Sequence, residues 1–274
     1  MNSDCAFAIG RVHRVCQDYA VAGGGDDGVS AFVLLADGCS SSPDSDIGAR
    51  LLVKAAQRFL PSPSAGDGEW EAAHNAALRR AAQVAQDLDL HLNCLDTTLL
   101  TITASGGAFA VNCCGDGIVA LGRSDGGLEV YAVSYAASYP NYLNYRLDDG
   151  RRAQWELQPG NEKRITHWTL GADGMTNEAS CLSRCACETW AGTADEYRFA
   201  AVLSDGVQSF TETCETDTSR SPRPVPLAEL LPPLLAFKGS RGQFVQRRAA
   251  SFFKECHTRR LSHGDDFSLG VVWM

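Results

Sequence analysis

Two short glycine turns constrain the fold of this chain more than any other feature of its sequence. SGG at 105–107 and SDGG at 124–127 each separate two apolar runs of strand length. Turns this short are typical of β-hairpins, and the strands that they join must run antiparallel. The middle of the chain is therefore predicted to be an antiparallel meander.

The remaining patterns give the order of the other elements. Apolar runs bounded by turn residues predict strands at Cys5–Ile9, Ala31–Leu35, Leu99–Thr103, Ala108–Cys113, Ile118–Gly122, Leu128–Val133, Arg198–Leu203 and Leu269–Trp273. Amphipathic periodicity predicts helices at Ile47–Phe59, Glu69–Leu88, Leu227–Leu235 and Gln243–His257. Strands and helices do not alternate, which disfavours a doubly wound parallel sheet. The order predicts an α+β fold of antiparallel sheets layered with helices.

The chain is expected to form a single domain over residues 1–274. This length suits one large domain or two modest ones, and no linker enforces a division. The stretch of about 135–196 is rich in Tyr, Asn, Gly and Cys, and is expected to be an insertion or flap over one face of the sheet. Residues 211–226 have the composition of a loop.

Charge and hydropathy exclude several classes of partner. The net charge of −9 and the pI of about 5.1 disfavour a nucleic-acid-binding protein, which would need a basic face. No apolar run is long enough for a transmembrane helix, and the N-terminus lacks the pattern of a secretory signal. We therefore expect a cytoplasmic protein without nucleic-acid or membrane partners.

The 11 cysteines are expected to be reduced thiols. Cys181, Cys185 and Cys187 are the closest cluster, but a zinc site needs four ligands, and the next candidate, His167, is distant in sequence. Free thiols are therefore favoured over zinc at this cluster.

Acidic residues recur at the edges of the predicted strands. They are Asp37, Asp18, Asp116, Asp205 and the pair Asp265 and Asp266. An Asp-Gly pair is common in turns, so one such position alone means little. Strand ends can converge at one rim, where gathered carboxylates would repel one another until a divalent cation binds. Oxygen ligands without nearby His or Cys suit Mg²⁺ or Mn²⁺.

The motifs around these residues resemble a known family. In order they are QD (17–18), ADG with a Ser-rich loop and IGA (36–49), DTT (96–98), GDG (115–117), SDGV (204–207) and GDDFS (264–268). The chain is similar to the metal-dependent Ser/Thr protein phosphatases of type 2C, and to a divergent bacterial branch of them. The resemblance implies a four-layer sandwich, in which two antiparallel β-sheets pack face to face with helices on both outer faces.

The resemblance also implies a centre of two Mn²⁺ or Mg²⁺ ions. Asp37 would bridge both ions, and the carbonyl of Gly38 would bind one of them. Asp205 and Asp265 would complete the other. The ions, about 4 Å apart, would lower the pKa of a shared water and clamp the phosphate, and the resulting hydroxide would attack phosphorus in line.

Further roles carried over by the resemblance are less central. Asp18 would hold a water bound to metal, and Asp116 with Asp205 would hold a third, weaker ion. Thr97 and Thr98 would support the rim as buried strand residues.

Several positions depart from the family pattern. Gln17 stands where a glutamate is usual, which would weaken one ion. His13 stands where an arginine commonly binds phosphate, and Arg14 is next to it; strand alternation would let only one of them face the site. Cys39 replaces a histidine proposed as general acid, which leaves His13 or solvent for that role.

Other neighbours of the motifs are expected to play structural parts. Ser40–Ser42 replace glycines, and Ser45 or Asp46 would cap the helix that follows. Asp266 would support the site without binding metal, and His263 would lie at the surface.

Two functions from different classes remain open at this stage. The first is an Mn²⁺- or Mg²⁺-dependent phosphatase that acts on phosphoserine or phosphothreonine in proteins, in a pathway with a cognate Ser/Thr kinase. The second is a weak or inactive pseudophosphatase that binds phosphoproteins as a regulatory module. A structural Ca²⁺ protein ranks below both, because no D-x-D-x-D-G loop is present.

Overall fold

The computed structural model of the chain describes residues 1–24, 30–136, 140–171, 176–212 and 222–274. Its strands are β1 (Asn2–Ala8), β2 (Tyr19–Gly24), β3 (Ala31–Ala36), β4 (Leu99–Ser105), β5 (Ala108–Cys114), β6 (Gly117–Arg123), β7 (Leu128–Tyr135), β8 (Lys163–Leu170), β9 (Thr176–Ser183), β10 (Cys187–Thr193), β11 (Tyr197–Leu203), β12 (Phe210–Glu212), β13 (Arg223–Pro224), β14 (Leu261–His263) and β15 (Phe267–Trp273). Its helices are α1 (Ser45–Ala56), α2 (Asp67–Asp87), α3 (Asp149–Glu156), α4 (Leu227–Leu234) and α5 (Phe244–Thr258), with short 3₁₀ helices η1 (Leu92–Leu95), η2 (Leu143–Leu147) and η3 (Asp205–Ser209).

The strands form two large antiparallel sheets. One has seven strands in the order β1-β15-β11-β6-β7-β8-β9, and the other has five in the order β10-β5-β4-β3-β2. The hairpins β4–β5 and β6–β7 occur at the two predicted glycine turns. A small third sheet has the order β13-β12-β14. The predicted meander is therefore real, but it is divided between the two large sheets after β5.

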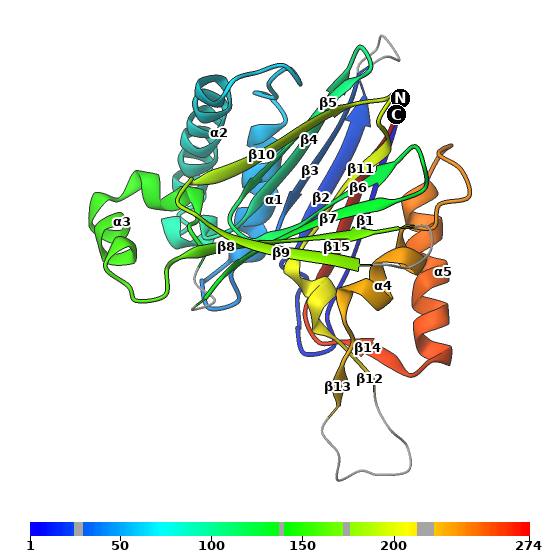
Figure 1. Cartoon of the computed structure of the whole chain (residues 1–274). Helices are drawn as coiled ribbons and strands as arrows, with labels where there is room; N and C mark the ends of the chain where they lie inside the picture. The colour runs from blue at the N-terminus through cyan, green and yellow to red at the C-terminus, as the bar shows by residue number, and fades with distance from the viewer. Residues whose placement is uncertain (25–29, 137–139, 172–175, 213–221) are drawn as a thin grey trace.

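Helices cover the outer faces of both large sheets (Figure 1). The layer between the sheets contains apolar side chains of both, among them Val33, Ile102, Val119 and Val202. Helices α1 and α2 pack on the five-stranded sheet, and α4 and α5 pack on the seven-stranded one. Both faces of the central strands are thus buried, which is why their sequences are almost continuously apolar. The predicted four-layer α+β sandwich is confirmed.

Part of the stretch 135–196 is built into the two large sheets. Strands β8 and β9 extend the seven-stranded sheet, and β10 forms an edge of the five-stranded sheet. These strands are half exposed and therefore rich in polar residues, which hides them from a search for apolar runs. Among the described residues of this stretch, η2 and α3 are the helices that lie outside the two large sheets.

The start of α1 differs from the prediction. Asp44, and neither Ser45 nor Asp46, is the N-cap; it has a left-handed backbone and makes no side-chain capping bond. Ser45 lies inside the helix, where its hydroxyl oxygen accepts a hydrogen bond from the side-chain amide of Gln17. The Ser45 hydroxyl is therefore used in a contact with the preceding loop.

Two sequence expectations concern segments near the limits of the description. Of the expected loop 211–226, residues 213–221 lie outside the described residues, and β12 and β13 flank them. Within the described ranges, no helix is long and apolar enough to cross a membrane.

Candidate active site and metal centre

The sheet registers bring the acidic motif residues to one rim of the sandwich. Asp37 follows β3, Asp116 lies between β5 and β6, Asp205 begins η3, and Asp265 precedes β15. All four line one cavity of about 320 Å³. Asp18 precedes β2, whose first residue pairs with the last residue of β3, so Asp18 lies beside Asp37. Positions that are far apart in the chain are thus gathered at one site.

The backbone of Asp37 is held by the start of β4. Its N–H donates to the Thr98 hydroxyl at 3.0 Å, and the Thr98 N–H donates to the Asp37 carbonyl at 2.9 Å. Gly38 forms a β-bridge with Thr97, and a Cβ at Gly38 would lie 2.6 Å from the Ser45 carbonyl oxygen. Thr97 and Thr98 are buried, as expected, and they fix the Asp-Gly pair in place.

Asp18 depends on a residue that the sequence did not single out. Its Oδ2 accepts a hydrogen bond from the Ser204 hydroxyl at 2.7 Å, and the Ser204 oxygen accepts another from the Ser268 N–H. The second oxygen of Asp18, Oδ1, is buried without a hydrogen-bond partner in the described structure. Ser204 stands directly before Asp205 in the SDGV motif, which was the only signal of its role.

Crowding of like charges makes these carboxylates hard to ionise together. Burial, and then the charges of Asp18 and Asp205, raise the pKa of Asp37 well above its usual range. Burial together with the Asp266 charge raises the pKa of Asp18 to about 7. Burial and the charges of Asp205 and Asp265 raise the pKa of Asp116 to about 7. Divalent cations would remove this repulsion.

The donor set fits a hard divalent cation. It consists of carboxylate and backbone oxygens, including the buried and unpartnered Oδ1 of Asp18. In the described structure, no three of these carboxylates have oxygens that all lie within 4.8 Å of one another. Binding of ions would therefore require the side chains to close in on them.

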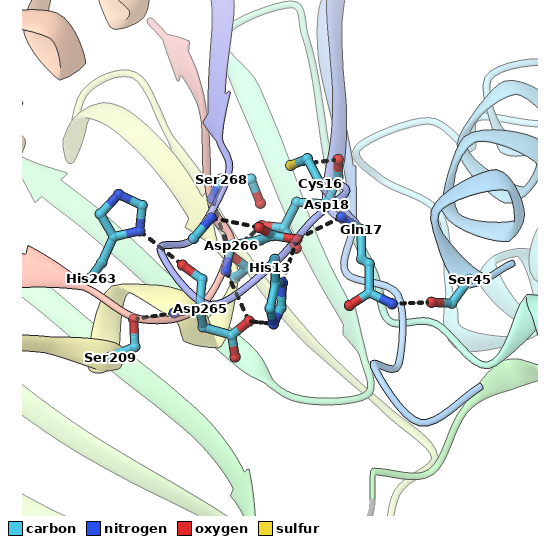
Figure 2. Close-up of polar contacts among 12 residues, drawn as sticks. His13, Cys16, Gln17, Asp18, Ser45, Ser209, His263, Asp265, Asp266 and Ser268 are labelled. Carbon is cyan, nitrogen blue, oxygen red and sulfur yellow. Dashed lines mark hydrogen bonds and ion pairs between the residues drawn. The ribbon is translucent and has the colours of Figure 1, made fainter. Parts of the chain in front are cut away.

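Asp266 organises the loop before β2 (Figure 2). It is not among the residues that line the cavity. It is 2% exposed, and it accepts hydrogen bonds from the N–H groups of Gly10 at 2.7 Å and Gln17 at 2.6 Å. Its Oδ2 lies 3.0 Å from Nδ1 of His13. Both oxygens are thus engaged, which agrees with the supporting role expected for this residue.

His13 reaches the acidic rim. Its Nε2 lies 3.3 Å from Oδ1 of Asp265, and Figure 2 shows the ring between Asp265 and Asp266. Burial lowers the pKa of His13, but the hydrogen bond and charge of Asp266, with the charges of Asp265 and Asp18, outweigh it and raise the pKa. The neighbouring carboxylates therefore favour the charged form of this imidazole.

Arg14 and Gln17 do not join the rim. Residues 9–18 form a loop, so the expectation that strand alternation chooses between His13 and Arg14 is wrong. Arg14 is exposed and does not line the cavity. The Gln17 amide points to Ser45 instead of the carboxylates and donates to its Oγ at 2.7 Å (Figure 2). The Gln17 side-chain nitrogen is therefore engaged with the first turn of α1.

The rest of the cavity is lined by neutral groups. Ser40, Ser41, Tyr142 and Gln208 are among its polar lining residues. The Cys39 sulfur lies 3.1 Å from the Ser41 hydroxyl oxygen. In the part of the chain that the structure describes, no lysine or arginine lines this cavity. The negative charge of a phosphate would therefore have to be balanced by metal ions.

Two predictions about isolated side chains need correction. His263 is half-buried instead of lying at the surface: its Nδ1 is 2.8 Å from the Asp265 carbonyl oxygen, and its ring stacks on Phe210. Cys187 is not a reduced thiol but forms a disulfide with Cys114.

The layered α+β fold and the acidic rim are the features of a class of metal-binding proteins. Comparison with protein families identifies the family within this class. The family model described as protein phosphatase 2C matches residues 10–237. The chain belongs to the protein phosphatase 2C family, as the sequence motifs predicted. This membership supports metal-dependent dephosphorylation of phosphoserine and phosphothreonine, and does not favour the pseudophosphatase alternative.

Solved structures share the fold. The serine/threonine phosphatase Stp1 from Staphylococcus aureus has a TM-score of 0.58 at 11% identity, and the match covers 100% of this chain and 95% of that chain. The S. agalactiae serine/threonine phosphatase has a TM-score of 0.53 at 13% identity, over 99% of this chain and 98% of that chain. At such low identities the likeness shows the fold alone. No curated protein sequence matches the chain.

Proposed function

We propose that this protein removes phosphate from phosphoserine and phosphothreonine of protein substrates, with two Mn²⁺ or Mg²⁺ ions and a third, weaker one. The observation that carries the proposal is the cavity onto which four distant acidic residues converge, with the buried Asp18 beside them. Burial, followed by the charges of neighbouring aspartates, raises the pKa values of Asp37, Asp116 and Asp205, which supports the proposal.

The residues at the rim have distinct parts in this proposal. Asp37 and the Gly38 carbonyl, with Asp205 and Asp265, would hold the two main ions. When bound, such ions lower the pKa of a water molecule and offset the charge of a phosphate.

Two further carboxylates would complete the centre. Asp116 would share the third ion with Asp205. Asp18, with one oxygen fixed by Ser204, would accept a hydrogen bond at its free Oδ1 and orient the attacking water.

Other side chains would bind and protonate the substrate. The hydroxyl groups of Ser40, Ser41 and Tyr142 line the cavity and would donate to phosphate oxygens. His13, whose pKa is raised, would give a proton to the leaving seryl or threonyl oxygen. Arg14 lies outside the cavity and would contact the substrate protein instead of the phosphate.

The setting of the protein is also part of this proposal. We infer that the chain is a single domain that acts in the cytoplasm. It would remove the phosphate that a cognate Ser/Thr kinase adds, as part of a bacterial signal-transduction pathway. The segment with η2 and α3 would act as the flap: Pro140 and Tyr142 at its start line the cavity. This segment is therefore placed to select among substrate proteins.

Turnover in solution tests the function. The full chain should hydrolyse p-nitrophenyl phosphate and a phosphothreonine peptide with Mn²⁺, and EDTA should stop both reactions. Asp205→Ala should abolish turnover while the variant still folds. Binding of the peptide without any hydrolysis in saturating Mn²⁺ would show that the catalytic proposal is wrong.

A further inference from the structure

A second group of metal-binding side chains lies outside the acidic rim. His74 on α2 faces Cys114 at the end of β5 and Cys187 at the start of β10. Nδ1 of His74 is 3.6 Å from the Cys114 sulfur and 3.9 Å from the Cys187 sulfur. His74 is 4% exposed and Cys114 is 1% exposed. Three elements from different parts of the chain therefore bring one imidazole and two sulfurs together in the interior.

This grouping stands out among the described residues. It is the one set of three His, Cys, Asp or Glu side chains there whose donor atoms all lie within 4.8 Å of one another. The two cysteines are direct cross-strand partners and form a disulfide in this structure. Two sulfurs and one imidazole nitrogen are donors that select zinc or another thiophilic metal over Mg²⁺ or Mn²⁺.

The distances suit a tetrahedral ion once the disulfide is reduced. Zn–S bonds of about 2.3 Å and a Zn–N bond of about 2.0 Å place nitrogen and sulfur about 3.5 Å apart. The two observed nitrogen–sulfur distances, 3.6 and 3.9 Å, are close to that value. The two sulfurs would have to separate to about 3.8 Å, by rotation about their Cα–Cβ bonds. The His74 imidazole already lies close to the required distance from both.

An open cavity gives access to this group. The cavity has a volume of about 410 Å³ and is lined by His74 and Cys187, together with Asp67, Glu71 and Glu188. The acidic lining favours the approach of a cation, and the space leaves room for a fourth ligand or water.

One neighbouring donor would steady a thiolate of this group. Arg146 Nη2 lies 3.9 Å from the Cys187 sulfur and would donate to it, whereas Oδ1 of Asn112, 3.2 Å from the Cys114 sulfur, can only accept a hydrogen bond. The positive charge of Arg146 opposes a cation, but two thiolates and the acidic lining outweigh it in number.

We propose that Cys114, Cys187 and His74 form a second metal site, which holds Zn²⁺ when the two cysteines are reduced and is closed when they form the disulfide. A dithiol reductant would supply two electrons and two protons, opening the disulfide to two thiols while it becomes a disulfide itself. Binding of Zn²⁺ would then release the two thiol protons. In either state, the edge strand β10 stays fastened to β5.

Cobalt absorption tests this site without any measurement of phosphatase activity. The full-length chain, reduced with a phosphine that carries no thiol, would be titrated with Co²⁺ as a probe for Zn²⁺. A sulfur-to-cobalt charge-transfer band should appear and should vanish when Zn²⁺ is added. Oxygen ligands at the acidic rim cannot produce this band. The unreduced chain should show none, because the disulfide occupies both sulfurs.

Matched variants identify the side chains that produce the band. Cys187→Ser and His74→Gln should lose or strongly weaken it, and circular dichroism would verify that each variant is folded. Cys181→Ser, at an exposed free cysteine on β9, should keep the full band. A reduced wild-type chain without a sulfur band, or a band that survives in folded Cys187→Ser, would overturn the proposal.

Discussion

The backbone of Asp37 is held by hydrogen bonds, but its side chain lies in an electrostatically unfavourable place. Two hydrogen bonds with Thr98 hold its main chain, while its buried carboxyl group lies among other acids. A side chain in this position gains little from the protein alone. A proton, or the divalent cation of the proposed function, would relieve this crowding.

Replacement of this proposed oxygen ligand should therefore stop the reaction. Asp37→Asn keeps the shape of the side chain but removes its charge, and should lower Mn²⁺-dependent turnover of p-nitrophenyl phosphate at least about a hundredfold, since the ions contribute several kcal/mol. Asp125→Asn, at an exposed turn, is the matched control and should be unchanged. If Asp37→Asn turned over substrate at the wild-type rate, the assignment of Asp37 to the metal centre would be wrong.

Ser204 should contribute to stability as well as to the site. In Ser204→Ala, the buried Asp18 carboxyl and the Ser268 N–H both lose a partner, which should cost about 1–3 kcal/mol of unfolding free energy. Urea denaturation in EDTA measures this cost. Ser124→Ala, where an exposed hydroxyl donates to a carbonyl, should change stability by less than about 0.5 kcal/mol. Equal effects in the two variants would argue against the buried contact.

At the scale of elements, Asp96 links the segment of η2 and α3 to the loop that follows Asp37. It is 4% exposed, and its oxygens accept hydrogen bonds from Ser42 at 2.7 Å, Asn144 at 2.8 Å and Arg151 at 2.9 Å. Ser42 belongs to the loop after Asp37, whereas Asn144 and Arg151 belong to η2 and α3. One buried carboxylate thus sets the position of α3 relative to the cavity.

Loss of the ion pair should loosen α3. Arg151→Gln leaves Asp96 with its two neutral partners, and should lower the unfolding free energy by about 1–3 kcal/mol and speed proteolysis in the segment of η2 and α3. Arg152→Gln, on the same helix but paired with the exposed Asp149, is the control and should behave like the wild type. If proteolysis is the same in both variants, Asp96 does not hold the segment.

The strands that could be predicted are those whose own sequence carries the signal, either an apolar run or a glycine turn. β3 and β4 are buried on both faces and read as apolar runs, and the two hairpins carry their own glycine turns. β8 and β9 could not be found in this way, because they are the last two strands at one end of the seven-stranded sheet, where many of their side chains are partly or fully exposed and polar. Such segments become strands because they pair with neighbouring strands, and a single stretch of sequence does not show this pairing.

The same limit applies to the site. The Asp-Gly motifs named the acidic residues, since each motif is local. The sequence could not show that Gln17 points to Ser45, or that His74 lies against Cys114, because only the folded chain brings these residues together.

For the whole molecule, the acidic rim should make the metal-free protein sensitive to pH. Asp18 and Asp116 keep protons up to about pH 7 when folded, whereas they release them near pH 4 when unfolded. Between these values the folded state binds more protons than the unfolded state. The unfolding free energy in EDTA should therefore fall as the pH rises across this range, by more than about 1.4 kcal/mol.

Urea denaturation at about pH 5 and pH 7.5 measures this fall. Mn²⁺ should reverse much of it at the higher pH, because the ions replace the protons, and Asp116→Asn should make the fall smaller. A stability that rises with pH in EDTA would show that the carboxylates are not crowded in solution.

The neutral and acidic lining of the cavity has a consequence for a cell short of metal. Since no described lysine or arginine lines it, only neutral donors would remain there to hold a phosphate, and the metal-depleted molecule should bind a phosphorylated chain weakly. Metal depletion would thus stop turnover, and the inactive protein would not keep phosphoproteins bound and out of reach of other enzymes.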